Sequence, residues 1–135
     1  MKALSLKQPY AELIRNGSKT IETRKWKTNY RGDLLICSSL SKHDGGVKYK
    51  DFVQSMKLLN YYTKNNIKIN YGYAICVVNL VDIQPMKKED EKLACCQIYD
   101  GAYSWFLENI RQIEQFPVKG QLNLFNVYDK LIIYK

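Results

Sequence analysis

Residues 17–26 read GSKTIETRKW, and this segment places Lys19, Glu22 and Arg24 in a turn and in the strand that follows it. Gly17 can adopt the left-handed conformation that ends a helix, so we expect the chain to reverse direction there. The residues from Thr20 onward favour a strand, in which Glu22 and Arg24 share one face because they are two positions apart. Lys19 can reach the same side from the turn. We predict that this charged group holds an anionic or hydrogen-bonding ligand.

The rest of the chain alternates between strand and helix patterns. Leu4 and Leu6 alternate with polar residues, as in a strand, and Pro9 is suited to the first turn of a short helix that ends at Gly17. Further along, the pattern predicts strands over 33–38, 71–83, 102–115 and 121–127, helices over 51–65 and 87–96, a polar loop over 38–50, and an edge segment over 131–134. These elements predict a mixed α/β domain.

Four segments resemble one known family. The pattern GxKxxExR over 17–24, preceded by ALSLxQPxAxLI over 3–14, is similar to the signature of the ASCH (activating signal cointegrator homology) domain. The runs YRGDLLI, GAYSWFLEN and PVKG follow in the family's order, at 30–36, 101–109 and 117–120. The resemblance extends from residue 2 to about 128. It implies a single PUA-like β-barrel over 1–135, with five to seven strands and two or three peripheral helices.

Length and composition agree with a single compact domain. A chain of 135 residues, 46% of them hydrophobic, is large enough for an independent core. The sequence has no apolar run of about 20 residues and no hydrophobic signal core, so we expect a cytoplasmic protein with no membrane partner. The net charge of +8 favours a polyanionic partner. A lysine-rich composition produced by codon bias explains that charge equally well.

The cysteines and the single histidine show no pattern typical of a metal site. Cys37 and Cys76 lie in apolar runs, and Cys95 and Cys96 are adjacent, so we expect free thiols rather than a zinc site or a disulfide framework. His43 lies in the polar loop and would have to fold back to form a catalytic pair with a thiol. We therefore predict neither a metal nor a cofactor.

Our first functional hypothesis is a module that recognises RNA or a modified nucleobase, as the resemblance implies. Cationic side chains would donate to phosphates or base edges, Glu22 would accept from an exocyclic amine, and Trp26 or Tyr103 would stack on a base. Trp105 could also stack, although we favour a core position for it. The expected ligand-binding residues are Gln8, Lys19, Glu22, Arg24, Trp26, Ser39, Tyr103 and Lys119. Among these, Ser39 stands where the family has a cleft-lining serine.

The alternative is an amidohydrolase acting on N4-acetylcytidine or a similar nucleoside, as some ASCH proteins are. Lys19 would then act as base or nucleophile, or Glu22 would activate water with Lys19 as the oxyanion partner. Glu22 occupies the position of the catalytic threonine of that branch, which weakens this hypothesis. Acidic residues near 89–91 join the pocket in some relatives, so Glu89 and Glu91 are candidates, although a solvated helical face explains them more simply.

A third interpretation of the motif is purely structural. Lys19, Glu22 and Arg24 could form an ion-paired network that only fixes the first helix to the sheet. A saturated network with no open cleft above Lys19 would support this interpretation. The sequence leaves the oligomeric state open.

Overall fold

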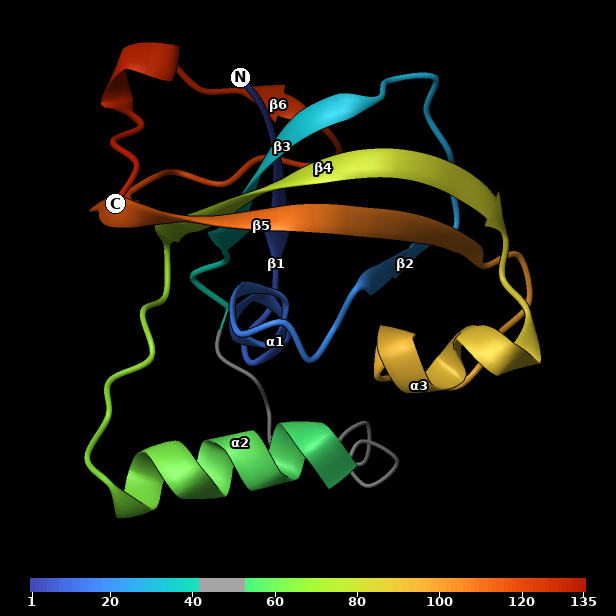
Figure 1. Ribbon diagram of the computed structural model, residues 1–135, viewed down its shortest axis with the longest axis horizontal. Helices are drawn as coiled ribbons and strands as arrows, with labels where there is room; N and C mark the ends of the chain where they lie inside the picture. Colours follow the sequence, from blue (N-terminus) through green and yellow to red (C-terminus); the bar gives the residue numbers. More distant parts are fainter. Residues whose placement is uncertain (42–52) are drawn as a thin grey trace.

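The computed structural model describes residues 1–41 and 53–135, which form one sheet with helices packed around it (Figure 1). In chain order the elements are β1 (Lys2–Leu6), α1 (Tyr10–Arg15), β2 (Ile21–Arg24), β3 (Gly32–Ser38), α2 (Val53–Lys64), β4 (Tyr73–Pro85), α3 (Glu91–Ala94), β5 (Tyr103–Pro117) and β6 (Phe125–Asn126). This content confirms the mixed α/β class. No helix in the described ranges is long and apolar enough to cross a membrane.

The six strands form an open sheet, so the predicted closed β-barrel is wrong. The strand order is β2-β5-β4-β3-β1-β6, and every neighbouring pair is antiparallel except β1 and β3. Its two edges are short, with four residues in β2 and two in β6. The strand predicted over 121–127 is reduced to β6, and the segment predicted over 131–134 contributes a single bridge, between Ile113 and Tyr134. The last part of the chain therefore supplies too little strand to close the sheet.

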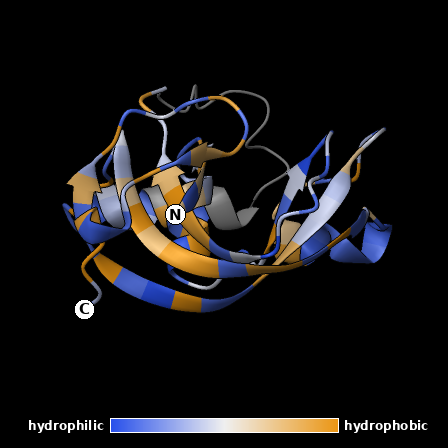
Figure 2. Cartoon of the chain, turned by 90° about the horizontal axis from the view of Figure 1, so that it is seen from above, coloured by the Kyte–Doolittle hydropathy of each residue, from blue (hydrophilic) through white to orange (hydrophobic). Residues whose placement is uncertain are grey.

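The two longest strands give the sheet its curvature. β4 and β5 pair along most of their length, and their register shifts at three places, between Ala74 and Cys76, Val77 and Asn79, and Leu80 and Asp82. Such irregularities bend a strand and increase its twist. Figure 2 shows the resulting curved sheet, and Figure 1 shows α1 beneath it with α2 farther from the strands.

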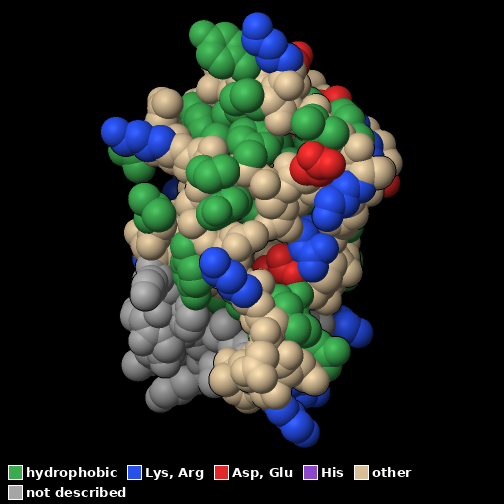
Figure 3. All heavy atoms as spheres, turned by 90° about the vertical axis from the view of Figure 1, so that its left-hand side faces the viewer, with side chains coloured by type: hydrophobic (Ala, Val, Ile, Leu, Met, Phe, Trp, Pro, Cys, Tyr) green, Lys and Arg blue, Asp and Glu red, His purple; other side chains and the backbone are tan. Residues whose placement is uncertain are grey.

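Both faces of the sheet are covered, which explains the continuous apolar run in β3. Leu34 and Ile36 pack in the same cluster as Ile14 of α1, whereas Leu35 packs in a second cluster with Phe125. Neighbouring side chains of a strand point to opposite faces of the sheet. Because both faces are covered here, Leu34, Leu35 and Ile36 are all buried. Hydrophobic side chains also reach the surface on the side of the molecule where the C-terminus lies (Figure 3).

Trp105 is fully buried, with an exposed fraction of 0%, which confirms its predicted core position. The rings of Trp105 and Trp26 pack nearly perpendicular to each other, with a centroid distance of 4.8 Å, and Trp105 Nε1 donates to the Trp26 carbonyl at 3.3 Å. Trp26 is therefore attached to the core through both contacts.

The predicted helices are present with altered bounds. α2 corresponds to the helix expected over 51–65, and a 3₁₀ turn (Lys88–Asp90) followed by α3 corresponds to the helix expected over 87–96. Most of the polar loop, including His43, lies outside the described residues. Apolar residues recur at helical spacing over 51–65 and predict a packed face of this helix, but the side chains concerned, Phe52, Val53, Met56 and Leu59, lie outside what the structure describes.

Candidate functional site

The turn after α1 brings Lys19 to the sheet. Gly17 has φ +89°, and the chain reverses its direction there. Two hydrogen bonds close the turn: the Gly17 N–H donates to the Ile14 carbonyl at 3.1 Å, and the Lys19 N–H donates to the Leu13 carbonyl at 3.0 Å. A glycine adopts this left-handed conformation at little cost. The helix end thus directs the side chain of Lys19 toward β2, as the sequence predicted.

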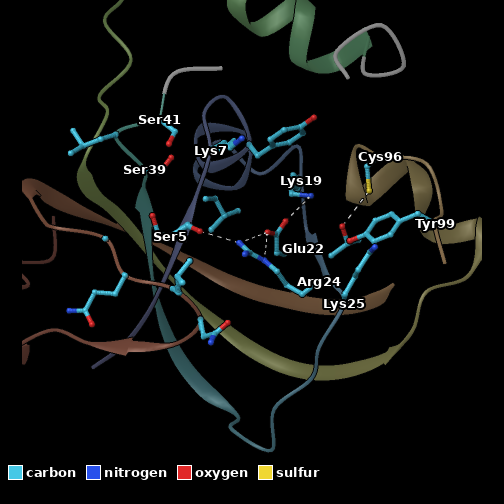
Figure 4. A pocket seen from close by; sticks show the side chains of 18 of the residues that line it. Ser5, Lys7, Lys19, Glu22, Arg24, Lys25, Ser39, Ser41, Cys96 and Tyr99 are labelled. Atoms are coloured by element: carbon cyan, nitrogen blue, oxygen red, sulfur yellow. Dashed lines mark hydrogen bonds and ion pairs between the residues drawn. The ribbon is translucent and has the colours of Figure 1, made fainter. Parts of the chain in front are cut away.

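Lys19, Glu22 and Arg24 form one continuous ion-paired network (Figure 4). Lys19 is 2% exposed, and its Nζ lies 3.3 Å from Glu22 Oε1 and donates to the Ala94 carbonyl at the end of α3. Arg24 lies on the other side of the carboxylate, with Nε 3.0 Å and Nη2 2.9 Å from Glu22 Oε2. Arg24 Nη2 also donates to the Ser5 carbonyl at 3.1 Å. The network therefore connects β1, the turn after α1, β2 and α3.

The two cations keep Glu22 ionised. Burial of the carboxylate acts to raise its pKa, but the nearby charges of Lys19 and Arg24 outweigh burial, so the pKa of Glu22 is lowered from 4.5. Glu22 is consequently a buried anion with a cation on each oxygen.

An open cavity of about 1240 Å³ lies directly over this network. Its lining includes five cationic side chains and one carboxylate, which are Lys7, Lys19, Arg24, Lys25, Lys119 and Glu22. Arg24 and Lys19 lie at the inner wall, whereas Lys7, Lys25 and Lys119 are exposed. The excess of cations makes the cavity suited to an anionic ligand.

Two tyrosines add aromatic surface to the cavity wall. The ring centroid of Tyr10 lies 5.6 Å from Lys19 Nζ, and Tyr99 lies beyond Cys96 on the α3 side (Figure 4). Tyr99 reaches this position because Cys95, with φ 55°, ends α3 in the left-handed conformation and turns the chain back. Sequence reasoning missed Tyr99, because no glycine or asparagine marks the reversal at Cys95.

Ser39 and Ser41 lie across the cavity from Tyr99 (Figure 4). Ser39 Oγ is buried and has no hydrogen-bond partner among the described residues. A buried hydroxyl without a partner costs free energy, so a bound ligand that supplies a partner would gain from it. The neighbouring loop over 119–123 forms another part of the wall and contains Leu122, which is 91% exposed.

The structure brings five of the eight predicted ligand-binding residues to the cavity, namely Lys19, Glu22, Arg24, Ser39 and Lys119. Gln8, Trp26 and Tyr103 do not line it. The amide of Gln8 is used within the fold, where Nε2 donates to the Asn70 carbonyl at 2.9 Å and Oε1 accepts from the Glu12 N–H at 3.0 Å. The cavity is also lined by three residues that were not predicted, namely Lys7, Tyr10 and Lys25. The sequence offered a signal for two of them, because Lys7 directly follows the first strand and Lys25 directly follows the GxKxxExR motif.

The remaining acidic candidates lie away from the cavity. Glu89 is exposed beside Lys87, at 4.0 Å between Glu89 Oε1 and Lys87 Nζ. Glu91 Oε2 accepts from the Ile98 N–H at 2.8 Å, so this carboxylate holds the segment that follows α3. Neither residue lines the cavity; Glu89 is solvated, whereas the Glu91 carboxylate is partly buried against the backbone.

The cysteines are free thiols in the structure. Burial raises the pKa of Cys37 and of Cys76 to about 12, so both remain protonated at neutral pH. Cys96 lines the cavity, with Sγ 3.6 Å from Thr23 Oγ1. Within residues 1–41 and 53–135 there is no group of three or more His, Cys, Asp or Glu residues that could hold a metal ion.

Comparison with known proteins places the chain in a family. It is 25% identical over 134 residues to activating signal cointegrator 1 of Mus musculus and of Homo sapiens; each alignment covers 95% of this chain and 22% of the relative's length. The crystal structure of a mutant ZmASCH protein from Zymomonas mobilis has the same fold, with a TM-score of 0.56, 12% identity, and coverage of 96% of this chain and 91% of that one. A model of the ASCH domain matches residues 4–117. The chain therefore belongs to the ASCH domain family.

Proposed function

We propose that this chain is a binding module for single-stranded RNA or a modified nucleobase, and that the large cavity is its site. The observation that carries the proposal is the cavity lining, in which, among the described residues, five cations and two tyrosines surround a single carboxylate. Cations and aromatic rings together are typical of proteins that bind single-stranded nucleic acid, because phosphates need charge and bases stack on rings.

The positions of the cations suggest how such a ligand would be held. The exposed Lys7, Lys25 and Lys119 are placed to meet phosphates at the mouth of the cavity. Deeper inside, Arg24 uses Nε and Nη2 for Glu22 and Ser5, and its Nη1 has no partner among the described residues. Arg24 Nη1 and Ser39 Oγ would then contact the edge of a base.

The contacts of the network do not favour the amidohydrolase alternative. A lysine that serves as base or nucleophile needs a neutral amine, whereas Lys19 Nζ is paired with a carboxylate and with the Ala94 carbonyl. Both oxygens of Glu22 are engaged by cations, which leaves this carboxylate poorly placed to activate water. Network and cavity are present together, so a purely structural role explains the ion pairs but not the open space above them.

The test is binding of a short random-sequence single-stranded RNA to wild type, Arg24→Ala and Arg31→Ala. Arg31 is a matched control because it is a partly exposed arginine, paired with Asp82 at 3.9 Å, that does not line the cavity. A charge-assisted contact contributes about 1.5–3 kcal/mol, so we expect Arg24→Ala to weaken binding at least tenfold and Arg31→Ala to change it by less than about twofold.

Two controls complete this experiment. Binding should weaken with added salt, because phosphate contacts release counterions. Acetate release from N4-acetylcytidine, measured in parallel, would support the amidohydrolase instead. Absence of RNA binding, or equal losses in Arg24→Ala and Arg31→Ala, would overturn the proposal.

A further inference from the structure

We propose that a second cavity beside the first accepts the neighbouring base of the bound strand, so that the protein prefers a dinucleotide to a mononucleotide. This inference rests on the proposed function. It adds a site for the second base of the bound strand, and the residues of this site lie outside the GxKxxExR motif.

The second cavity adjoins the first. It has a volume of about 410 Å³ and is lined by residues 85–86 and 98–103. Ile98 and Tyr99 line both cavities, so this pair forms the wall between them. Tyr99 is 38% exposed, which leaves part of its ring accessible to a ligand that passes from one cavity to the other.

The chemistry of the second cavity suits a base better than a phosphate. Asp100 is its one charged residue among the described residues that line it, and a carboxylate repels phosphate but accepts a hydrogen bond from the exocyclic amine of a base. Tyr99 and Tyr103 supply aromatic rings, and Met86 and Ala102 supply apolar contacts. A flat, partly apolar group with hydrogen-bond donors on its edge fits this lining.

Two lysines are placed to hold the phosphate that joins the two nucleotides. Lys25 lines the first cavity, as Tyr99 does. Lys27 is exposed, and its Nζ lies 5.6 Å from the ring centroid of Tyr103, which lines the second cavity. The two residues follow β2 at alternate positions. A cation is thus available beside each cavity, as a strand that occupies both would require.

The proposal predicts a difference in affinity between two probes. We would measure equilibrium binding of the pool of 5′-mononucleotides and of the pool of dinucleoside monophosphates to the full chain. We expect the dinucleotide pool to bind wild type about tenfold more tightly, because one additional base stacks. In Tyr103→Leu this ratio should fall to about one while mononucleotide affinity stays within about twofold of wild type.

The variants make the outcomes separable. Tyr103→Phe keeps the ring and should keep the ratio. Lys27→Ala changes an exposed side chain and should reduce the ratio of dinucleotide to mononucleotide affinity at least threefold, so it tests the proposal even if Tyr103→Leu fails to fold. The control is Lys130→Ala, which removes an exposed charge that lines neither cavity and should leave this ratio unchanged.

The results also distinguish the second cavity from the proposed function. Two results would overturn the second cavity as a binding site while the proposed function stands. In the first, wild type binds the two pools equally; in the second, Tyr103→Leu and Lys27→Ala both leave the ratio of dinucleotide to mononucleotide affinity intact. Failure of wild type to bind either pool would also overturn the second cavity, and the proposed function would fall with it only if the single-stranded RNA fails to bind as well.

Discussion

Two ion-paired clusters of the molecule share their chemistry but differ in their surroundings. In the first, Glu12 accepts from Arg15 within α1 and from the hydroxyl of Tyr62 of α2. In the second, Glu22 lies between Lys19 and Arg24. Both carboxylates are buried, with exposed fractions of 6% for Glu12 and 8% for Glu22.

The difference lies in what each cluster faces. The Glu12 cluster joins two helices and lines neither described cavity, whereas the Glu22 cluster forms the inner wall of the larger one. A buried ion pair alone is therefore no sign of a binding site. An open cavity over the pair, together with further cations at its mouth, distinguishes the second cluster as the candidate.

The largest effect on stability is expected from Lys19→Met. Methionine keeps most of the volume of the side chain but leaves Glu22 without one of its two cations. Removal of one partner from a buried ion pair costs about 3–5 kcal/mol, and Arg24 retains part of that interaction, so we expect the free energy of unfolding to fall by about 3 kcal/mol.

Urea denaturation measures this change. The control is Lys25→Met, which removes an exposed lysine six positions farther along the chain and should change the free energy of unfolding by less than about 0.5 kcal/mol. A loss of less than about 1 kcal/mol in Lys19→Met would mean that the network contributes little to the fold.

A smaller effect is expected from Arg15→Met in the other cluster. Arg15 is 28% exposed, so water can solvate part of the carboxylate that remains, and the Tyr62 hydroxyl still donates to Glu12. We expect a loss of about 2 kcal/mol in the free energy of unfolding, with RNA affinity within about twofold of wild type. Denaturation and RNA binding, measured on the same preparation, test both parts; a folded Arg15→Met protein that no longer binds RNA would contradict the comparison of the two clusters.

The elements of the fold could be predicted because their signals are local. Gly17 marks the end of α1, and the apolar runs at 33–38 and 71–83 mark β3 and β4. Closure of the sheet could not be predicted, because it depends on whether the residues after 120 pair with a distant edge. The alternating pattern over 121–127 is equally compatible with a strand and with the loop that lines the cavity, and only two of these residues pair in β6.

The same distinction holds for the site. The sequence predicted that three side chains would lie together, those of Lys19, Glu22 and Arg24, because the turn and the strand bring them together within eight residues. Tyr99 was missed because its position depends on the conformation of Cys95 and on the contact of the following segment with Glu91. Trp26 and Tyr103 were expected to stack on a ligand in the cleft on the basis of residue type alone, but the structure places neither in the large cavity.

The smallest expected effect concerns the pH dependence of stability. Because the folded-state pKa of Glu22 lies below its unfolded value of 4.5, the unfolded chain takes up the proton more readily than the folded one. The stabilisation is therefore complete above about pH 4.5 and is lost as the pH falls through the lower folded-state pKa. Glu22→Gln lacks this titrating group, so its free energy of unfolding should fall less steeply on acidification.

Urea denaturation of wild type and Glu22→Gln, repeated from neutral pH down into the acid range, measures the difference between the two slopes. We expect wild type to be the more stable of the two at neutral pH and its advantage to shrink as the solution becomes acidic, since a protonated Glu22 no longer attracts Lys19 and Arg24. An advantage that stays constant across this range would show that the charge of Glu22 does not stabilise the fold. The two clusters would then differ only in the open cavity that the Glu22 cluster lines.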